Sequence, residues 1–330
     1  MNNYFVQTYT WNPWRNLAVE KYLADKIEPG DVVLYLWQND HTVVIGRNQN
    51  AIRECKAQLL EEEGGFLARR TTGGGAVYHD LGNLNFTFLA SPERYDLEKQ
   101  LKVIQAACRK FGIETQFSGR NDIITEDGFK FSGNAFFDSK GCYYHHGTLL
   151  LNVDTASMSR FLNPSKAKLQ SKGVDSVRSR VVNLSSLCPE ITVDTMKQAM
   201  FTAFSKVYGL PCVPLCAERL EQTAIQDGRE RFSSERWKYG PKIPFTNRLE
   251  QRFSWGEVNL DLHVNEGMIT KALLSSDSME ADWFSDIGTE FHGLPYRTDI
   301  LCKTLDHSLE QHLVPENIRA DLCRMVQEQI

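Results

Sequence analysis

The chain has 330 residues, 42% of them hydrophobic and 24% charged, which is ordinary for a globular protein of one large or two average domains. Its formal net charge of −5 argues against nucleic-acid binding, because such binding depends on excess Lys and Arg that neutralise phosphates. No apolar run approaches the roughly 18 residues of a membrane-spanning helix, and the N-terminus has no basic stretch followed by an apolar one, so we expect a cytoplasmic protein without a membrane segment.

The first half of the chain alternates helical patterns with short β-rich runs. A helix is predicted to begin at Asn12 and to extend to about residue 27, because apolar residues between Trp14 and Tyr22 recur at helical spacing. Residues 31–37 and 41–46 are β-rich runs separated by three polar residues, which predicts a hairpin. The other elements expected here are helices over 54–63 and 95–111 and strands over 66–68, 76–78, 83–89, 123–125 and 129–137, with 76–78 and 83–89 continuing one sheet.

The second half is expected to complete this domain and to add a smaller one. Residues 164–180 are polar, cationic and poor in large apolar side chains, which favours a surface loop, and residues 211–227 could form a helix or an irregular link. Prolines near residue 246 indicate a boundary, so we predict an α+β catalytic domain over residues 1–246 and a small α+β accessory domain over 247–330. The remaining expected elements are a strand over 145–153, helices over 154–162 and 192–208, strands over 248–255, 258–264 and 268–274, and helices over 281–291, 297–313 and 315–329.

Residues 69–80 (RRTTGGGAVYHD) are the segment around which the chain is organised. Because glycine has no Cβ, Gly73, Gly74 and Gly75 can adopt positive φ and let backbone N–H groups converge on phosphate or carboxylate oxygens. Arg70 can add a planar fork of donors. The spacing matches neither the P-loop nor the dinucleotide-binding turn, and three glycines taken alone are as typical of a tight hairpin.

Asp122 and Lys130 form a second candidate pair. A hairpin at residues 126–128 places them on neighbouring strands, where the carboxylate could hold Mg²⁺ while the ammonium meets the same phosphate-bearing ligand. The alternative is an exposed cross-strand ion pair, which contributes little to stability. His145 and His146 lie on another predicted strand, where one of two adjacent side chains must face the opposite side of the sheet.

Three segments, in this order, resemble the signatures of the lipoate-protein ligase family: residues 69–80, residues 130–135 (KFSGNA) and residues 146–151 (HGTLLL). The resemblance extends over most of the chain, from about residue 16 to Trp255. It implies an α+β fold whose mixed-sheet catalytic domain has the architecture shared by lipoate ligases, biotin protein ligases and class II aminoacyl-tRNA synthetases. A small α+β C-terminal domain would follow it.

The resemblance also implies a two-step ligase reaction that lipoylates other proteins. In the first step the carboxylate of lipoate attacks the α-phosphorus of ATP, which forms lipoyl-AMP and pyrophosphate. In the second step the ε-amine of a lysine takes the lipoyl group and releases AMP. The implied acceptors are lipoyl domains of 2-oxoacid dehydrogenase E2 subunits and the glycine cleavage H protein. ATP and Mg²⁺ are the implied cofactors, and lipoate or octanoate is the implied small-molecule substrate.

Individual residues acquire roles from the same resemblance. Lys130 is the implied catalytic residue, because it would bridge the phosphate and acyl oxygens. The implied nucleotide-binding residues are Arg70, Gly75, Ala76, Val77, Tyr78, Lys130, Ser176 and Val177, the last two in a loop that covers the adenylate. The implied lipoate-binding residues are Arg70, Thr72, Gly74, His79, Asn83, Lys130 and His146. Asp122 and Asn121 are the implied Mg²⁺ ligands.

One departure and two alternatives accompany this interpretation. Where the family carries an arginine before the two histidines, this sequence has Lys140, which supplies charge but no bidentate fork. An octanoyl or lipoyl transferase of the same fold would work without ATP through a cysteine thioester, for which Cys142 is the nearby candidate among eight scattered cysteines that we expect to be free thiols. The third possibility is a non-catalytic protein that binds lipoate or adenylate.

Overall fold

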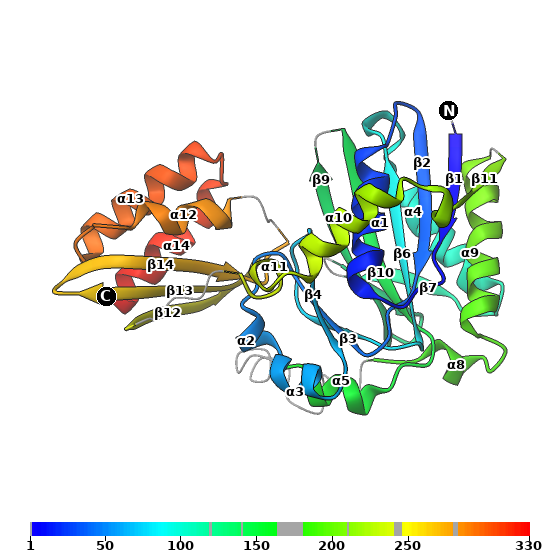
Figure 1. Ribbon diagram of the computed structural model, residues 1–330, viewed down its shortest axis with the longest axis horizontal. Coiled ribbons are helices and arrows are strands. Elements are labelled where there is room, and N and C mark those ends of the chain that lie inside the picture. The colour runs from blue at the N-terminus through cyan, green and yellow to red at the C-terminus, as the bar shows by residue number, and fades with distance from the viewer. Residues whose placement is uncertain are drawn as a thin grey trace.

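The computed structural model describes residues 2–118, 121–139, 141–163, 181–209, 211–240, 246–279 and 283–330. These residues form one eight-stranded sheet and two three-stranded sheets, with helices packed on their faces. In Figure 1 the sheet of β12, β13 and β14 lies with its helices to one side of the larger body. None of the helices in these segments is both long and apolar enough to cross a membrane.

The bounds of the elements in the described segments are as follows. The strands are β1 (Asn2–Gln7), β2 (Asp31–Trp37), β3 (Thr42–Ile45), β4 (Phe66–Arg69), β5 (Val77–His79), β6 (Asn83–Ala90), β7 (Thr115–Ser118), β8 (Asp122–Thr125), β9 (Lys130–Ser139), β10 (Cys142–Leu150), β11 (Cys212–Cys216), β12 (Asn247–Phe253), β13 (Gly256–Asn265) and β14 (Met268–Ser276). The α-helices are α1 (Pro13–Asp25), α2 (Ala51–Glu54), α3 (Ala57–Glu62), α4 (Leu97–Arg109), α5 (Thr155–Phe161), α8 (Leu184–Leu187), α9 (Val193–Tyr208), α10 (Gln222–Ser233), α11 (Glu235–Tyr239), α12 (Phe284–Glu290), α13 (Thr298–Gln311) and α14 (Glu316–Gln329).

The eight-stranded sheet has the order β11-β1-β2-β6-β10-β9-β8-β7. β1 runs parallel to both of its neighbours, and the other neighbouring pairs are antiparallel. Helices α4 and α9 cover one face, where Phe86 and Phe88 of β6 pack against Val103 and Phe204. Helices α1 and α10 pack against each other over the opposite face (Figure 1). The sheet is therefore buried on both sides.

The longer helices begin and end at residues that suit those positions. The side chains of Asn12, Asp96 and Thr192 each accept the backbone N–H three residues ahead, at the starts of α1, α4 and α9. Gly112 and Gly209 follow α4 and α9 with φ of 74° and 67°, which glycine adopts without strain. The three corresponding helix predictions are confirmed.

The hairpin predicted for residues 31–46 is wrong. β2 pairs with β1 and β6 in the large sheet, whereas β3 pairs with β4 and β5 in a separate sheet. β5 and β6, predicted to continue one sheet, are likewise divided between the two. Both β2 and β3 are buried along their whole length. Uninterrupted apolar runs of this kind carry no alternation that could specify their partners.

Other boundaries differ from the prediction in smaller ways. The helix expected over residues 54–63 is shorter, since α3 covers Ala57–Glu62, and α2 (Ala51–Glu54) precedes it. The strand expected from residue 145 begins at Cys142. The undecided stretch 211–227 contains β11 and the start of α10, and the strands β1 and β7 were not anticipated. Residues 164–180, predicted to form a loop, lie outside the described residues.

The C-terminal part has its own apolar core. β12, β13 and β14 form an antiparallel sheet, and side chains such as Leu260, Phe291 and Leu305 bury it against α12, α13 and α14. Its last strand meets the larger body where Ser276 donates its N–H to the carbonyl of Asn48 (3.0 Å). Residues 241–245 lie outside the described residues, so the division at residue 246 stays a prediction.

We expect the two cores to lose stability independently. Phe204→Ala removes a buried ring from α9, and Leu305→Ala removes a buried side chain from α13. Each substitution should lower the unfolding free energy of its own part by about 2–5 kcal/mol, because it leaves a cavity there. Native-state hydrogen exchange, followed peptide by peptide, locates the loss. Equal loss of protection in both parts for either variant would mean that the two cores unfold as one unit.

Candidate functional site

A cavity of about 170 Å³ lies beside the glycine turn, on the face of the large sheet that α1 covers. Of the residues singled out from the sequence, it is lined by Arg70, Gly74, Gly75, Ala76, Val77, His79, Asn121, Lys130 and His146. Thr72, Tyr78, Asn83 and Asp122 lie outside its lining, and Tyr78 turns its ring away to stack on Phe161, with the ring centroids 5.8 Å apart. Ser176, Val177 and Lys140 lie outside the described residues.

The cavity runs across the strands of the sheet. In the register of the strands, Asp122 is opposite Gly133, and Asn85 is opposite both Thr148 and Trp37. The row is continuous, because the backbone N–H of Gly133 donates to Thr148 Oγ1 (3.3 Å). Four steps of about 4.8 Å between strands give a row of roughly 19 Å. The Asp122 end and the Trp37 end of this row differ in chemistry.

The glycine turn is held from inside by Arg70. Its Nη2 donates to the carbonyls of Gly73 (2.7 Å) and Gly75 (2.8 Å), and its Nη1 donates to the carbonyl of Val44 (3.3 Å). Burial lowers the pKa of Arg70 to about 10, so the side chain keeps its charge at neutral pH. Most of the donors predicted for a ligand are used by the turn itself. A direct contact of Arg70 with nucleotide or acyl carboxylate stays a prediction.

Arg69 faces the other side and anchors the same strand end to α11. Its Nη1 donates to the carbonyls of Arg47 (2.7 Å) and Gln49 (2.6 Å), and its Nε donates to that of Trp237 (2.8 Å). The indole Nε1 of Trp237 donates back to the carbonyl of Arg69 (2.8 Å). Burial lowers the pKa of Arg69 to about 10. The two adjacent arginines therefore fix the turn from both sides of β4.

A chain of buried hydrogen bonds connects the turn to α1 and the sheet. Arg70 Nε donates to Thr72 Oγ1 (3.0 Å), which lies 2.8 Å from His146 Nε2. His146 Nδ1 lies 2.8 Å from Glu20 Oε1, and the hydroxyl of Thr87 donates to the same oxygen (2.7 Å). Thr72 and His146, predicted to bind lipoate, are thereby held in one network with Arg70.

Glu20 is a site residue that sequence reasoning missed. It is 1% exposed, and Asn16, one helical turn earlier, is 0% exposed. Both lie on the face of α1 that also buries Leu17. Two polar residues four positions apart on a buried helical face are unusual, since buried polar groups need partners. The spacing of Asn16 and Glu20 on the apolar face of the predicted helix could therefore have identified Glu20 from the sequence.

His79 presents an unpaired donor at the Trp37 end of the cavity. Asn16 uses its amide N–H groups on backbone carbonyls and on Asn39 Oδ1 (3.1 Å), so Asn39 must donate through Nδ2 to His79 Nδ1 (3.1 Å). The ring proton is then on Nε2, which has no partner among the described residues. Burial, with the charges of Arg70 and His146, lowers the pKa of His79 to about 3, so the ring is neutral.

Two asparagines add further unpaired groups near the same end. Asn83 donates through Nδ2 to Asn85 Oδ1 (3.0 Å), which leaves Asn83 Oδ1 and Asn85 Nδ2 buried without partners in the described part of the chain. Asn85 lines the cavity, and Asn83 supports it. An unpaired buried polar group costs about 1–3 kcal/mol. A ligand or ordered water that pairs with these groups would remove that cost.

The opposite end carries Lys130 and Asp122, which are about one third exposed. Lys130 Nζ lies 2.6 Å from Asp122 Oδ1, as expected from neighbouring strands. No three His, Cys, Asp or Glu side chains gather in the described segments as a metal site would require. A single carboxylate suits Mg²⁺ when phosphate oxygens and waters complete the coordination shell. Asp122 therefore fits as one ligand of a phosphate-bound Mg²⁺, and does not form a metal site by itself.

Cys142, the candidate nucleophile of the transferase alternative, is badly placed for that role. Its side chain is 2% exposed, and burial raises the pKa of its thiol to about 12, whereas a nucleophilic cysteine needs a lowered pKa. It also lies four residues from His146 along β10, which corresponds to roughly 13 Å. All eight cysteines are free thiols, as expected.

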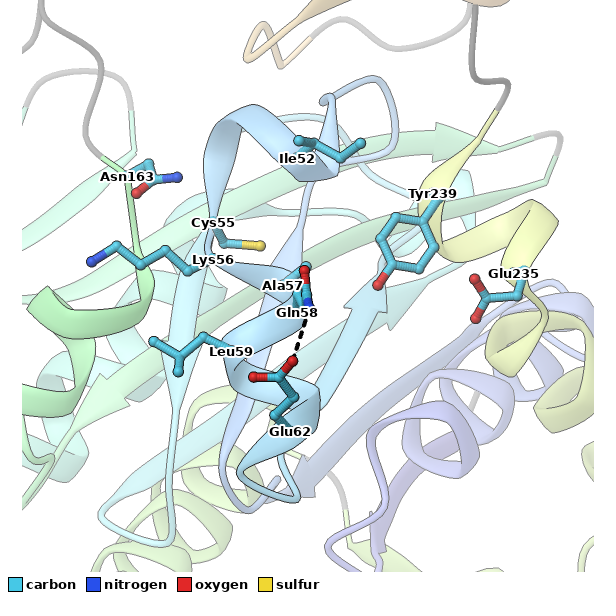
Figure 2. A pocket seen from close by; sticks show the side chains of 10 residues that line it. All are labelled: Ile52, Cys55, Lys56, Ala57, Gln58, Leu59, Glu62, Asn163, Glu235 and Tyr239. Atoms are coloured by element: carbon cyan, nitrogen blue, oxygen red, sulfur yellow. Dashed lines mark hydrogen bonds between the residues drawn. The ribbon is translucent and has the colours of Figure 1, made fainter.

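A wider hollow of about 670 Å³ lies among α2, α3 and α11 (Figure 2). Its polar side chains do not converge on one point. Gln58 donates a hydrogen bond to Glu62 (2.8 Å) along α3, and Lys56 points away from Tyr239 and Glu235 (Figure 2). Burial raises the pKa of Cys55, on its wall, to about 12. Its lining therefore presents no activated nucleophile, and the smaller cavity is the candidate site.

The C-terminal part contacts the outer side of the glycine turn. The carbonyl of Ser278 accepts the N–H of Gly74 (2.9 Å). A Cβ on Gly73 would lie 2.4 Å from that carbonyl oxygen and 2.6 Å from the carbonyl oxygen of Met279. Glycine is therefore required at position 73 for this close approach. One of the N–H groups predicted for anion binding is thus paired within the chain.

Comparison with known families agrees with the resemblance. A model described as the lipoyl protein ligase A/B catalytic domain matches residues 12–205, which is more than half of the chain. A second model, described as the bacterial lipoate protein ligase C-terminus, matches residues 242–325.

Solved structures of lipoate ligases are similar to this chain. LipL1 of P. falciparum, solved in complex with lipoate, has a TM-score of 0.79 and 26% identity over 98% of this chain and 100% of its own. A bipartite lipoate protein ligase of Thermoplasma acidophilum, described with its E2 lipoyl domain, has a TM-score of 0.66 and 26% identity over 75% of this chain and 100% of its own. A lipoate-protein ligase A bound with ATP has a TM-score of 0.63 and 24% identity over 73% and 99%. The predicted α+β fold is confirmed.

The buried histidines predict a pH dependence of stability. Burial lowers the pKa of His79 and His145 from 6.5 to about 3, so between these values only the unfolded chain binds the proton. The unfolding free energy should therefore fall, as pH falls through this window, by about 1.4 kcal/mol per pH unit and histidine. Urea unfolding from about pH 7 to pH 5 measures the slope. His79→Gln should reduce this slope by the contribution of one histidine, about 1.4 kcal/mol per pH unit. An unchanged slope would mean that His79 takes up the proton in the folded protein.

Proposed function

Because this chain belongs to the lipoyl protein ligase A/B family, we propose that it activates lipoate with ATP and transfers the lipoyl group to a lysine of an acceptor lipoyl domain. The observation that supports this proposal is the cavity that runs across the strands. Lys130 lies at one end of it, and the unpaired Nε2–H of His79 lies near the other end. A slender carboxylic acid suits such a cavity, with its charged head beside the ammonium.

The proposed lipoate lies along the row from Lys130 toward Trp37. Its carboxylate meets Lys130, its methylene chain passes Val77 and Ala135, and its dithiolane end reaches the donors of His79 and Asn85. Each buried methylene contributes about 0.8 kcal/mol. The lipoate complex of the similar LipL1 supports this choice of ligand. Thr72 and Asn83 then act through their hydrogen bonds to His146 and Asn85.

The nucleotide is proposed to lie at the glycine turn. A volume of about 170 Å³ is below the roughly 300–1,000 Å³ of pockets for drug-sized ligands, so the acyl chain fills it and the adenylate needs adjoining space. Backbone N–H groups of residues 74–78 and the buried charge of Arg70 favour phosphate oxygens there. The nucleotide would replace the carbonyl of Ser278 on the N–H of Gly74. Ser176 and Val177 stay proposed contacts.

In the first step a lipoate carboxylate oxygen attacks the α-phosphorus of ATP, and pyrophosphate leaves. Lys130 holds the attacking carboxylate and stabilises charge that builds on the α-phosphate. Asp122 and Asn121 would hold Mg²⁺, which neutralises phosphate charge when it is bound. Asp122 keeps Lys130 oriented through their 2.6 Å contact.

In the second step the acceptor amine attacks the acyl carbon of lipoyl-AMP, and AMP leaves. Negative charge then develops on the acyl oxygen, at the position where Lys130 already held the carboxylate. One ammonium thus serves both steps. Lipoyl domains of E2 subunits and the H protein are the proposed acceptors, and the T. acidophilum ligase, described with an E2 lipoyl domain, supports the first of these.

Pyrophosphate release tests the proposal against its alternatives. On mixing with ATP, Mg²⁺ and lipoate, the full chain should release pyrophosphate and should then lipoylate a lipoyl domain. A transferase would release none but would move an acyl group from a carrier thioester, which the buried Cys142 disfavours. A non-catalytic binder would do neither. Either of these results would overturn the proposed ligase reaction.

Lys130→Ala should slow both steps. Removing one preorganised donor of this kind costs about 10²–10³ in rate, or roughly 3–4 kcal/mol of transition-state stabilisation. Lys130→Arg should rescue poorly, because a wide planar fork cannot replace a compact ammonium at one bridging point. Adenylation is measured as pyrophosphate release, and transfer is measured from lipoyl-AMP supplied ready-made. Normal transfer by the alanine variant would confine Lys130 to adenylation, and normal rates in both steps would leave it a plain ion-pair partner of Asp122.

A further inference from the structure

His145 lies on the face of β10 opposite to the candidate site and is completely buried. Its ring stacks on Phe136, with the ring centroids 4.7 Å apart, and meets Phe86 edge-on at 5.3 Å. Its Nδ1 lies 3.0 Å from Oε1 of Gln100 on α4, and its Nε2 lies 2.9 Å from Asn134 Oδ1. The family resemblance assigns no role to this residue, yet both ring nitrogens have specific partners.

Asn134 connects this histidine to the nucleotide end of the cavity. Its backbone N–H (2.8 Å) and its side-chain Nδ2 (3.0 Å) both donate to the carbonyl of Asn121. Asn121 Nδ2 donates back to the carbonyl of Asn134 (3.1 Å). Three hydrogen bonds therefore clamp the residue directly before Asp122. Asn121 and Asn134 both line the cavity beside Lys130.

The carbonyl of Asn121 decides which ring nitrogen of His145 carries the proton. A carbonyl only accepts, so Asn134 must present Nδ2 to Asn121 and Oδ1 to His145. His145 therefore donates through Nε2. Burial lowers the pKa of His145 to about 3, so the neutral ring has no second proton and Nδ1 can only accept. We therefore assign the Gln100 amide the opposite orientation, with its nitrogen and not Oε1 at Nδ1.

The far end of this chain is anchored on α9. In this assigned orientation the Gln100 oxygen can accept from the buried hydroxyl of Tyr208. Burial raises the pKa of that hydroxyl, and its interaction with the Gln100 side chain lowers it. This orientation gives a partner each to Gln100 Nε2 and the Tyr208 hydroxyl, which otherwise have none among the described residues. Tyr208, Gln100, His145, Asn134 and Asn121 thus form one directional series of hydrogen bonds.

Gly147 makes the central contact of the series sterically possible. A Cβ at this position would lie 2.9 Å from Asn134 Oδ1, 2.7 Å from the carbonyl oxygen of Gly133 and 2.6 Å from the ring of Phe86. Such distances exclude any larger residue unless the backbone shifts. The absence of a side chain on Gly147 therefore leaves room for the His145–Asn134 hydrogen bond.

We propose that His145 is a positioning residue, which orients Asn134 and through it fixes Asn121 and Asp122 at the nucleotide end of the site. The role rests on the proposed adenylation reaction, in which Asp122 and Asn121 serve the phosphates and their Mg²⁺. His145 itself touches no reactant, since its side chain lies on the opposite face of the sheet. Its Nε2–H acts by holding one amide orientation.

Two matched substitutions separate this role from simple packing. His145→Gln places an amide nitrogen near the position of Nε2 and can still donate to Asn134. His145→Asn places its amide near the position of Nδ1 and cannot reach Asn134. Both remove the ring that stacks on Phe136, so both should lower the melting temperature by a similar amount.

The two variants should differ in catalytic activity although their melting temperatures are similar. We expect His145→Asn to lower kcat/KM for ATP in pyrophosphate release by about 10–100-fold, the loss typical when a group that orients a metal or phosphate ligand is removed. His145→Gln should stay within about threefold of the unsubstituted protein. The KM for lipoate and the transfer from supplied lipoyl-AMP should change by less than about threefold in both variants. Calorimetric titration with Mg²⁺ and ATP should show the same order of affinities.

Hydrogen exchange supplies a readout that needs no activity. Peptides that contain Asn121 and β8 should exchange faster in His145→Asn than in His145→Gln, because only the first variant releases the clamp. Equal exchange and equal ATP kinetics in the two variants would overturn the proposal and leave His145 a packing residue. If the unsubstituted protein releases no pyrophosphate, the proposed function fails, and the exchange comparison still decides the role of His145.

Discussion

The buried guanidinium of Arg70 is the constraint on which the candidate site depends. A buried charge is tolerated only when hydrogen bonds replace its water, and Arg70 obtains them from carbonyls of the turn that it supports. The turn's carbonyls therefore point inward. Gly46 and Gly74 allow this packing, since a Cβ on Gly46 would lie 2.0 Å from the carbonyl oxygen of Gly74, and Gly74 has a φ of 93°.

Strand β10 carries two adjacent histidines whose hydrogen bonds hold residues near both ends of the cavity. His146 faces the turn and connects Thr72 to Glu20, whereas His145 faces the opposite side and orients Asn134. Both side chains are buried because helices cover both faces of the sheet. Two adjacent histidines can thus hold two different loops from one strand. Of the two, His146 lines the cavity, whereas His145 acts from outside it.

The proposed orientation of lipoate follows from the chemical difference between the two ends of the cavity. Lys130 and Asp122 place opposite charges where a carboxylate and phosphates would meet. His79 and Asn85 place unpaired donors where a polarisable ring would lie. The C-terminal part reaches the outer side of the glycine turn through the carbonyl of Ser278, and the proposed nucleotide would compete with this carbonyl for the N–H of Gly74.

The sequence alone determined the helices with clear caps, the α+β class and the segments that line the site, because capping, periodicity and glycine content are local properties. It also placed Asp122 and Lys130 on neighbouring strands, since one short hairpin joins them. Sheet membership was decided by the tertiary structure, because β2 and β3 are both buried along their whole length and only packing assigned them to different sheets. The partners of Arg70, Glu20 and His145 were decided in the same way. Their hydrogen bonds join residues 11 to 126 positions apart, or close a turn whose shape glycine leaves open, and no local pattern encodes such a pairing.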